Sequence, residues 1–131
     1  MKETIIMIII LILIIASGIG IQKYLVESSN MLCEKLENLK TEIGMEKQEQ
    51  KTTENINRLA NEIEEEWKEI NKIWSTVILH EELDMIEMSL LEVKSSIQVQ
   101  DLESSLEEID KTIFLVGHIK EKEALKWRNI F

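Results

Sequence analysis

The sequence contains no proline, one cysteine and four glycines among 131 residues. Because proline and glycine are the residues that most disfavour helix interiors, their scarcity favours long helices. A single cysteine cannot form an intramolecular disulfide, and no Cys/His spacing typical of a zinc site occurs. Glycine-rich phosphate loops and serine nucleophile elbows are absent as well. We therefore expect neither an enzyme nor a cofactor.

Basic residues are also scarce, with 15 Lys and Arg against 25 Asp and Glu, which gives a net charge of −10. Proteins that bind nucleic acid without sequence preference concentrate Lys and Arg on one face to neutralise phosphates. The sequence has no such basic cluster, so nucleic acid is not expected as a partner.

The most prominent feature that is present is an uncharged run from Ile5 to Ile21. As a helix this run covers roughly 25 Å, slightly less than the roughly 30 Å hydrocarbon core of a bilayer. Extension to Val26 completes a span, with the Lys23 ammonium reaching the headgroups and Tyr24 at the interface. We expect residues 1–26 to form a permanent single-pass anchor in the cell membrane, with membrane lipid as a partner.

A cleaved signal peptide is the alternative, because Ala16-Ser17-Gly18 offers the small residues of a cleavage site. The apolar run is longer than the core of a usual signal peptide, which favours the anchor. Positive charges flank both ends and do not decide the orientation. A very short tail before a long body is typical of an anchor that leaves the body outside, so residues 27–131 are expected to be extracytoplasmic.

Four apolar stripes at helical spacing follow and predict four helices. Their members are Leu25, Leu32, Leu36, Leu39 and Ile43; Ile56, Leu59, Ile63, Trp67, Ile70, Trp74 and Val77; Leu79, Leu83, Ile86, Leu90, Val93 and Ile97; and Leu102, Leu106, Ile109, Ile113 and Val116. Turns are expected at Gly44 with residues 46–52 and near Leu79 to Glu82, and Asp101 is a suitable N-cap. We expect an all-α fold, in which an N-terminal transmembrane helix precedes an up-and-down antiparallel bundle of four helices, or of three with a bend.

The C-terminal segment differs from the acidic body in its charge. In a bundle with an even number of helices the last helix returns to the anchor, and residues 111–131 carry five basic and two acidic residues. Lys120 falls on the fourth stripe, where an apolar residue is expected. Basic side chains followed by aromatic ones are typical of a membrane interface, which predicts lipid contact for Lys120, Lys126, Trp127, Arg128 and Phe131. The alternative is that Trp127, Ile130 and Phe131 only cover the end of the bundle.

A second set of apolar residues lies off the predicted core stripes, on the third and fourth helices. It consists of Met85, Met88, Leu91, Phe114 and Leu115. Exposed together, these residues would form a surface for a protein partner or a second copy of the chain, and methionine adapts well to such contacts. Burial in a bundle packed differently from our expectation is the alternative.

Two motifs suggest chemistry only weakly. His80-Glu81-x-x-Asp84 resembles the zinc-binding H-E-x-x-H motif, which makes a metal-dependent hydrolase a remote alternative. The other histidine, His118, is expected at the same height, but helical geometry points the two rings apart. No metal site is therefore predicted, and the acidic residues between Glu62 and Glu69 are interpreted as a solvated helix face.

The short N-terminal span, Trp67 and Trp74 before His80-x-x-x-Asp84-x-Ile86-Glu87, and the terminal Asn129-Ile130-Phe131 together resemble a known family. It is an uncharacterised domain-of-unknown-function family of small membrane-anchored helical proteins of spore-forming bacteria. The resemblance implies a single-pass membrane location and no known catalytic residues. The leading hypothesis is a membrane-anchored interaction module, an accessory or scaffold protein of an envelope or sporulation-related complex. A sensor-like bundle that binds a small ligand is the alternative.

Overall fold

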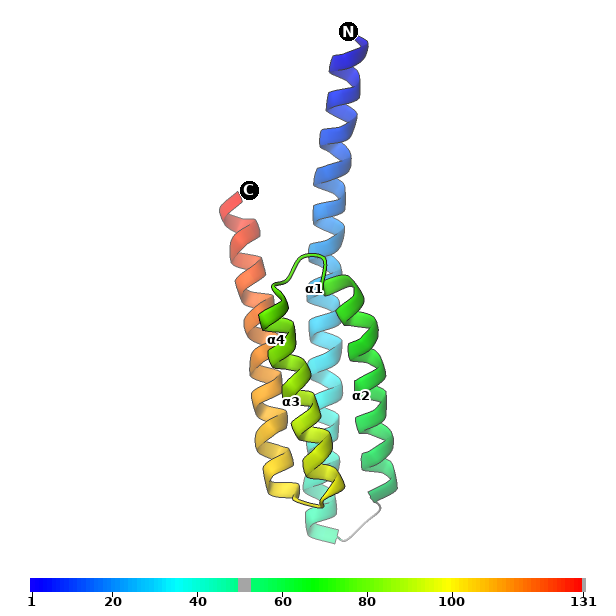
Figure 1. Cartoon of the computed structure of the whole chain (residues 1–131), viewed down its shortest axis with the longest axis vertical. Coiled ribbons are helices and arrows are strands. Elements are labelled where there is room, and N and C mark those ends of the chain that lie inside the picture. Colours follow the sequence, from blue (N-terminus) through cyan, green and yellow to red (C-terminus); the bar gives the residue numbers. More distant parts are fainter. Residues whose placement is uncertain (50–52, 131) are drawn as a thin grey trace.

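The computed structural model describes residues 1–49 and 53–130, without the side chains of residues 48, 49, 53 and 130. It contains four helices, α1 (Lys2–Glu49), α2 (Thr53–Trp74), α3 (His80–Gln98) and α4 (Leu102–Ile130). No strand occurs in these described ranges. Consecutive helices run in opposite directions, so the structure confirms an all-α, up-and-down bundle of four helices that follows a long apolar N-terminal segment (Figure 1).

The four helices do not pack equally against one another. α1 lies between α2 and α4, and α3 completes the bundle by packing closely against α4 and more loosely against α2. The connection from α2 to α3 lies at the end of the bundle from which the N-terminal half of α1 emerges (Figure 1). We call this end the exit end. The α3–α4 loop lies at the opposite end.

The core consists of almost fully buried side chains from all four helices and from the α2–α3 connection. Its apolar members are Leu25, Leu32, Leu36, Leu39, Ile43, Ile56, Ile63, Trp67, Ile70, Trp74, Ile78, Leu83, Ile86, Val93, Ile97, Ile109, Val116 and Ile119. The structure therefore confirms the complete first stripe and the burial of both Trp67 and Trp74. Their rings pack edge to face, with centroids 5.9 Å apart, as aromatic pairs prefer.

Polar groups inside the bundle have specific partners. Trp74 Nε1 donates a hydrogen bond of 3.0 Å to the Ser28 hydroxyl, which links α2 to α1. The hydroxyls of Ser89 and Thr112, both buried, are 2.6 Å apart and link α3 to α4. Because an unpaired buried hydroxyl is costly, these bonds favour one helix register over its alternatives.

The turns lie at different residues from those expected. α1 continues through Gly44 to Glu49, so the predicted turn at Gly44 is wrong. One glycine costs a helix only about 1 kcal/mol, and the burial of neighbouring Ile43 outweighs that cost. The rest of that predicted turn, residues 50–52, lies outside the described residues.

The second turn covers residues 75–79 rather than Leu79 to Glu82, because α2 ends at Trp74 and α3 begins at His80. Because α2 ends at Trp74, the helical spacing of buried side chains does not continue through residues 75–79. As a consequence Ile78 is buried, whereas Val77 and Leu79, both assigned to the core, are exposed. The prediction that these two residues belong to the core is wrong.

The core face of α4 is shifted from the predicted stripe. The buried residues are Ser105, Ile109, Thr112, Val116, Ile119 and Glu123, so small polar side chains replace Leu106 and Ile113, which are only partly buried. Ile119 occupies the core position that we assigned to Lys120. The assignment of Lys120 to the core stripe is therefore wrong. The expected N-cap is confirmed, because the Ser104 backbone N–H donates to Asp101 Oδ1 at 3.1 Å. This bond lowers the pKa of Asp101.

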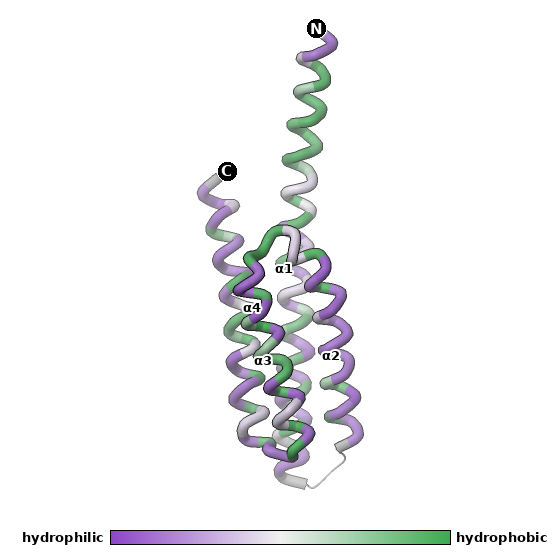
Figure 2. The backbone as a smooth tube through the Cα atoms, in the orientation of Figure 1, coloured by the Kyte–Doolittle hydropathy of each residue, from purple (hydrophilic) through white to green (hydrophobic). Residues whose placement is uncertain are grey.

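α1 is much longer than its neighbours and leaves the bundle. Its 48 residues extend about 72 Å, against about 33 Å for the 22 residues of α2. The emerging half is hydrophobic along its length (Figure 2), and its most apolar 18-residue window has no buried residue. By length and composition α1 is able to cross a membrane, a criterion that signal sequences also meet.

Candidate functional site

The exit end of the bundle brings together most residues that we expected at a membrane interface. Lys23 and Tyr24 lie on α1 just below its apolar half. Lys23 is exposed and 3.8 Å from Glu27, whereas Tyr24 packs partly against the core. Trp127 and Arg128 belong to the last turns of α4, whose C-terminal end lies at the exit end, as expected for a returning helix (Figure 1).

The closest contact at the exit end is between Trp127 and Gly18. A Cβ atom built on Gly18 would lie 2.2 Å from Trp127 Cη2, which is far inside van der Waals contact. The ring can therefore lie on the α1 backbone only because residue 18 has no side chain. Nothing lies within 4 Å of a Cβ built on Gly20, two residues further on. This contact was not predictable from the sequence, because no local pattern links residues so distant along the chain.

Several basic side chains at the exit end of α4 have partners within the protein. Lys120 Nζ donates to Asn30 Oδ1 at 3.0 Å, and Lys126 Nζ donates to the buried Glu123 at 3.0 Å. Arg128 is exposed. The Lys120–Asn30 contact links α4 to α1, the Lys126–Glu123 pair lies within α4, and the guanidinium of Arg128 is left at the surface. Phe131, which we also assigned to a membrane interface, lies outside the described residues.

The α2–α3 connection adds exposed apolar side chains to the same end. Val77 and Leu79 are 39% and 62% exposed. Both residues fall on predicted core stripes, so their exposure was not expected from the sequence. A break in helical spacing between Trp74 and Leu83 was the signal that could have identified a loop here.

A notch of about 400 Å³ lies between α1 and the end of α4. One side is a single face of α1, with residues spaced three or four apart, and the other side is Trp127. The lining residues are Ile19, Gln22, Lys23, Val26, Glu27 and Trp127. Gln22 Oε1 is buried and has no hydrogen-bond partner among the described residues. We call this feature the exit notch.

Four of the five residues of the predicted interaction patch are exposed. Met85, Met88, Leu91 and Phe114 have exposed fractions between 53% and 69%, whereas Leu115 is partly buried against the core. The Ser89–Thr112 contact places Met88 and Phe114 at nearly the same height on adjacent helices. The Phe114 ring stacks on His118, with centroids 6.0 Å apart. The surface over α3 and α4 is therefore apolar around Met88 and Phe114.

Two polar contacts cross the loosely packed side of the bundle between α2 and α3. Trp67 Nε1 donates to Glu87 Oε2 at 2.6 Å, and Lys94 pairs with Glu64. The hydrogen bond from Lys94 lowers the pKa of Glu64. The crevice that they cover, which Leu91 also lines, has a volume of only about 30 Å³. It has room for about one water molecule rather than for an organic ligand.

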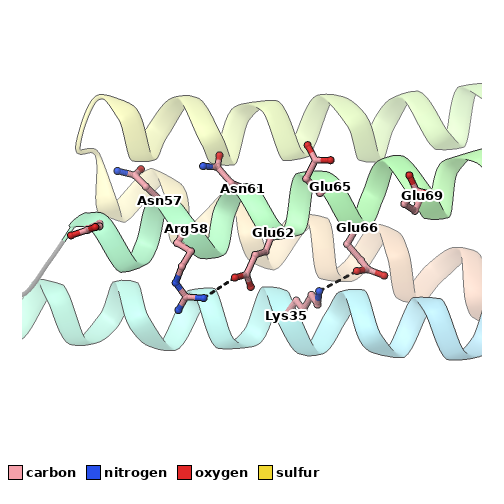
Figure 3. Close-up of a pocket in the computed structure, with 9 residues that line it drawn as sticks. Lys35, Asn57, Arg58, Asn61, Glu62, Glu65, Glu66 and Glu69 are labelled. Carbon is pink, nitrogen blue, oxygen red and sulfur yellow. Dashed lines mark hydrogen bonds and ion pairs between the residues drawn. The ribbon is translucent and has the colours of Figure 1, made fainter.

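A wider, open groove of about 960 Å³ runs along α1 and α2 (Figure 3). It is lined by five glutamates and only two basic residues, each of which pairs with a glutamate: Lys35 with Glu66 at 3.1 Å and Arg58 with Glu62 at 2.7 Å. Other glutamates of this face pair with lysines on α2 itself, as Glu69 does with Lys72. The arrangement matches the predicted solvated acidic face.

The residues of the zinc-like motif lie on the first turn of α3. His80 and Asp84 are exposed. The ring of His118 stacks on Phe114, and both lie on α4. Among the described residues, no group of three or more His, Cys, Asp or Glu side chains is placed to hold a metal ion.

Comparison with known proteins gives one match. Residues 19–130, from the end of the apolar run through α4, match the sequence profile of a domain of unknown function, DUF4363. No curated protein and no solved structure matches the chain.

Proposed function

The chain belongs to the DUF4363 family of domains of unknown function, and from its structure we propose a non-catalytic, membrane-anchored helical interaction module. One observation carries this proposal: a single helix, α1, is half apolar and unburied and half built into the core of the bundle. A cleaved leader has no need to continue as a core helix. An anchor that must hold a body at a fixed height above the bilayer benefits from this continuity, because the helix contains no flexible linker.

The exposed surface around Met88 and Phe114 supports an interaction role. Exposed apolar groups gathered on adjacent helices typically mark contacts with other proteins. We propose that this surface binds a partner in the cell envelope or a second copy of the chain. The resemblance to proteins of spore-forming bacteria suggests an accessory or scaffold role in an envelope or sporulation-related complex, with the body outside the cytoplasm.

Membrane fractionation of the full chain tests the anchor. The protein should remain in the membrane pellet after extraction at high pH and should retain Met1 as its amino terminus. Release of a soluble chain that begins near Ile19 would contradict the proposal, because it would identify the apolar run as a cleaved signal peptide.

Crosslinking in the native membrane tests the interaction surface. Met88→Glu with Phe114→Glu should abolish the crosslinked product and leave the helical circular dichroism unchanged. Met45→Glu is a matched control, because Met45 is equally exposed but lies outside the surface. Unfolding of the double variant would show that the two residues belong to the core.

A further inference from the structure

The exit notch has the features of a phospholipid site, and we propose that it binds one molecule of phosphatidylethanolamine. This inference rests on the proposed anchoring of α1, which places the notch at the surface of the bilayer. The apolar side chain of Ile19 and the ring of Trp127 supply a surface for the upper acyl chain and glycerol region. Tryptophan is well suited to this depth, because its ring is apolar and its N–H is polar.

The charged residues of the notch occur in the order that this headgroup requires. Lys23 lies two residues beyond the apolar run, and Glu27 lies one helical turn, or about 6 Å, further from it. In phosphatidylethanolamine the phosphate is attached to the glycerol, and the ammonium follows it. Lys23 is therefore placed to bind the phosphate, and Glu27 is placed to bind the ammonium.

Both side chains are available for such a ligand. Lys23 and Glu27 are 3.8 Å apart, and their side chains are 74% and 66% exposed. An exposed pair at this distance is weak, so little is lost when each group turns to a headgroup. Because the two charges cancel, the notch itself does not select an anionic lipid.

Hydrogen bonding distinguishes phosphatidylethanolamine from phosphatidylcholine. A primary ammonium has three N–H donors, as in lysine, whereas the quaternary ammonium of choline has none. The notch offers an acceptor at the height of the ammonium, the Glu27 carboxylate. We expect ethanolamine to donate to this carboxylate, whereas choline has no N–H donor to offer it.

Fluorescence quenching of the full chain in nanodiscs tests the site. Equimolar mixtures of phosphatidylethanolamine, phosphatidylcholine and phosphatidylglycerol are prepared with bromine on the acyl chains of one lipid at a time. Trp67 and Trp74 are buried, so the difference between the wild type and Trp127→Phe reports on Trp127 alone. Brominated phosphatidylethanolamine should quench roughly two to five times more efficiently than the other two lipids, as expected for one or two exposed charged contacts.

A charge exchange supplies the matched variant. Lys23→Glu with Glu27→Lys keeps the net charge and the spacing but reverses the order, so the preference should fall to none. Arg58→Glu with Glu62→Arg exchanges a pair of the same spacing far from the notch and should keep the preference.

Each other result has a distinct meaning. Equal quenching by all three lipids, a preference for phosphatidylglycerol, or a preference that survives the exchange at Lys23 and Glu27 would overturn the lipid site but not the anchor. If no brominated lipid quenches Trp127, the exit end does not lie at the bilayer, and the proposed anchoring fails as well.

Discussion

Gly18 is the position where one missing side chain decides how two helices meet. The Trp127 ring occupies the space that a Cβ atom would need, and it lies closer to that position than any other group outside the neighbouring backbone of α1. Its contact with the α1 backbone therefore determines where the end of α4 lies relative to the apolar segment.

Gly18→Ala and Gly20→Ala form a matched pair that tests this contact. Alanine favours a helix over glycine by about 1 kcal/mol at either position. At Gly20 this gain should appear in full, because the added Cβ meets open space. At Gly18 the Cβ displaces Trp127, so the free energy of unfolding should rise less or fall, and the fluorescence of Trp127 should shift. Equal stability of the two variants would show that the ring moves without cost.

The buried hydroxyls of Ser89 and Thr112 act as a pair. Ser89→Ala or Thr112→Val should each lower the free energy of unfolding by about 1 kcal/mol, because each leaves its partner short of a hydrogen bond. The double variant should cost less than the sum, since the bond between the two hydroxyls is already lost in either single variant. A double-mutant cycle by urea denaturation measures the difference, and additivity within about 0.5 kcal/mol would contradict the coupling.

Among the elements, α2 is the least firmly held. It packs on α1, but it meets α3 mainly through a narrow crevice that is crossed by two polar contacts. The pair of Lys94 and Glu64 is about one third exposed, so its contribution is small, at most about 1 kcal/mol. α2 is therefore the helix that we expect to separate first when the bundle is perturbed.

Acid should weaken the contact between α2 and α3. The pKa of Glu64 is lower in the folded chain than in the unfolded chain, so its contribution is complete above the unfolded value of about 4.3. The contribution is lost as the pH falls through the lower, folded value. The protection of α2 amides against hydrogen exchange, relative to their intrinsic exchange rate at each pH, should fall over this range, and less so in Glu64→Gln. Identical acid dependence in the two proteins would show that the pair does not hold the helices together.

Acidic and apolar surfaces lie on different parts of the molecule, which the net charge of −10 alone does not show. The acidic groove lies along α1 and α2, whereas the apolar half of α1, the Val77–Leu79 loop and the end of α4 all gather at the exit end (Figures 1 and 2). This arrangement suits a body that stands on a bilayer with its acidic sides in water.

Cysteine labelling tests the side of the membrane on which the body lies. Cys33 is half-buried, and burial raises the pKa of its thiol, so it should react slowly. In a Cys33→Ser background, Glu103→Cys provides an exposed thiol at the start of α4, far from the exit end. An impermeant maleimide should label it in intact cells. Labelling only after lysis would place the body in the cytoplasm.

Local sequence determined the helical fold, because helix propensity and apolar spacing act within a few residues. The four helices, the first core stripe, the burial of Trp67 and Trp74 and the N-cap at Asp101 were therefore predictable. The same reasoning identified the apolar segment of α1. It also selected exposed residues around Met88 and Phe114, although it could not distinguish them from Leu115, which the bundle partly covers.

Only the tertiary structure decided which side chains meet across helices. Small polar residues such as Ser105 and Thr112 occupy the core face of α4, because close helix packing favours small side chains that find hydrogen-bond partners. The contact of Trp127 with Gly18, and the notch beside it, depend on the relative position of two helices whose contact residues are more than a hundred positions apart. Spacing along one helix contains no information about such a distance, since it results from the packing of the whole bundle.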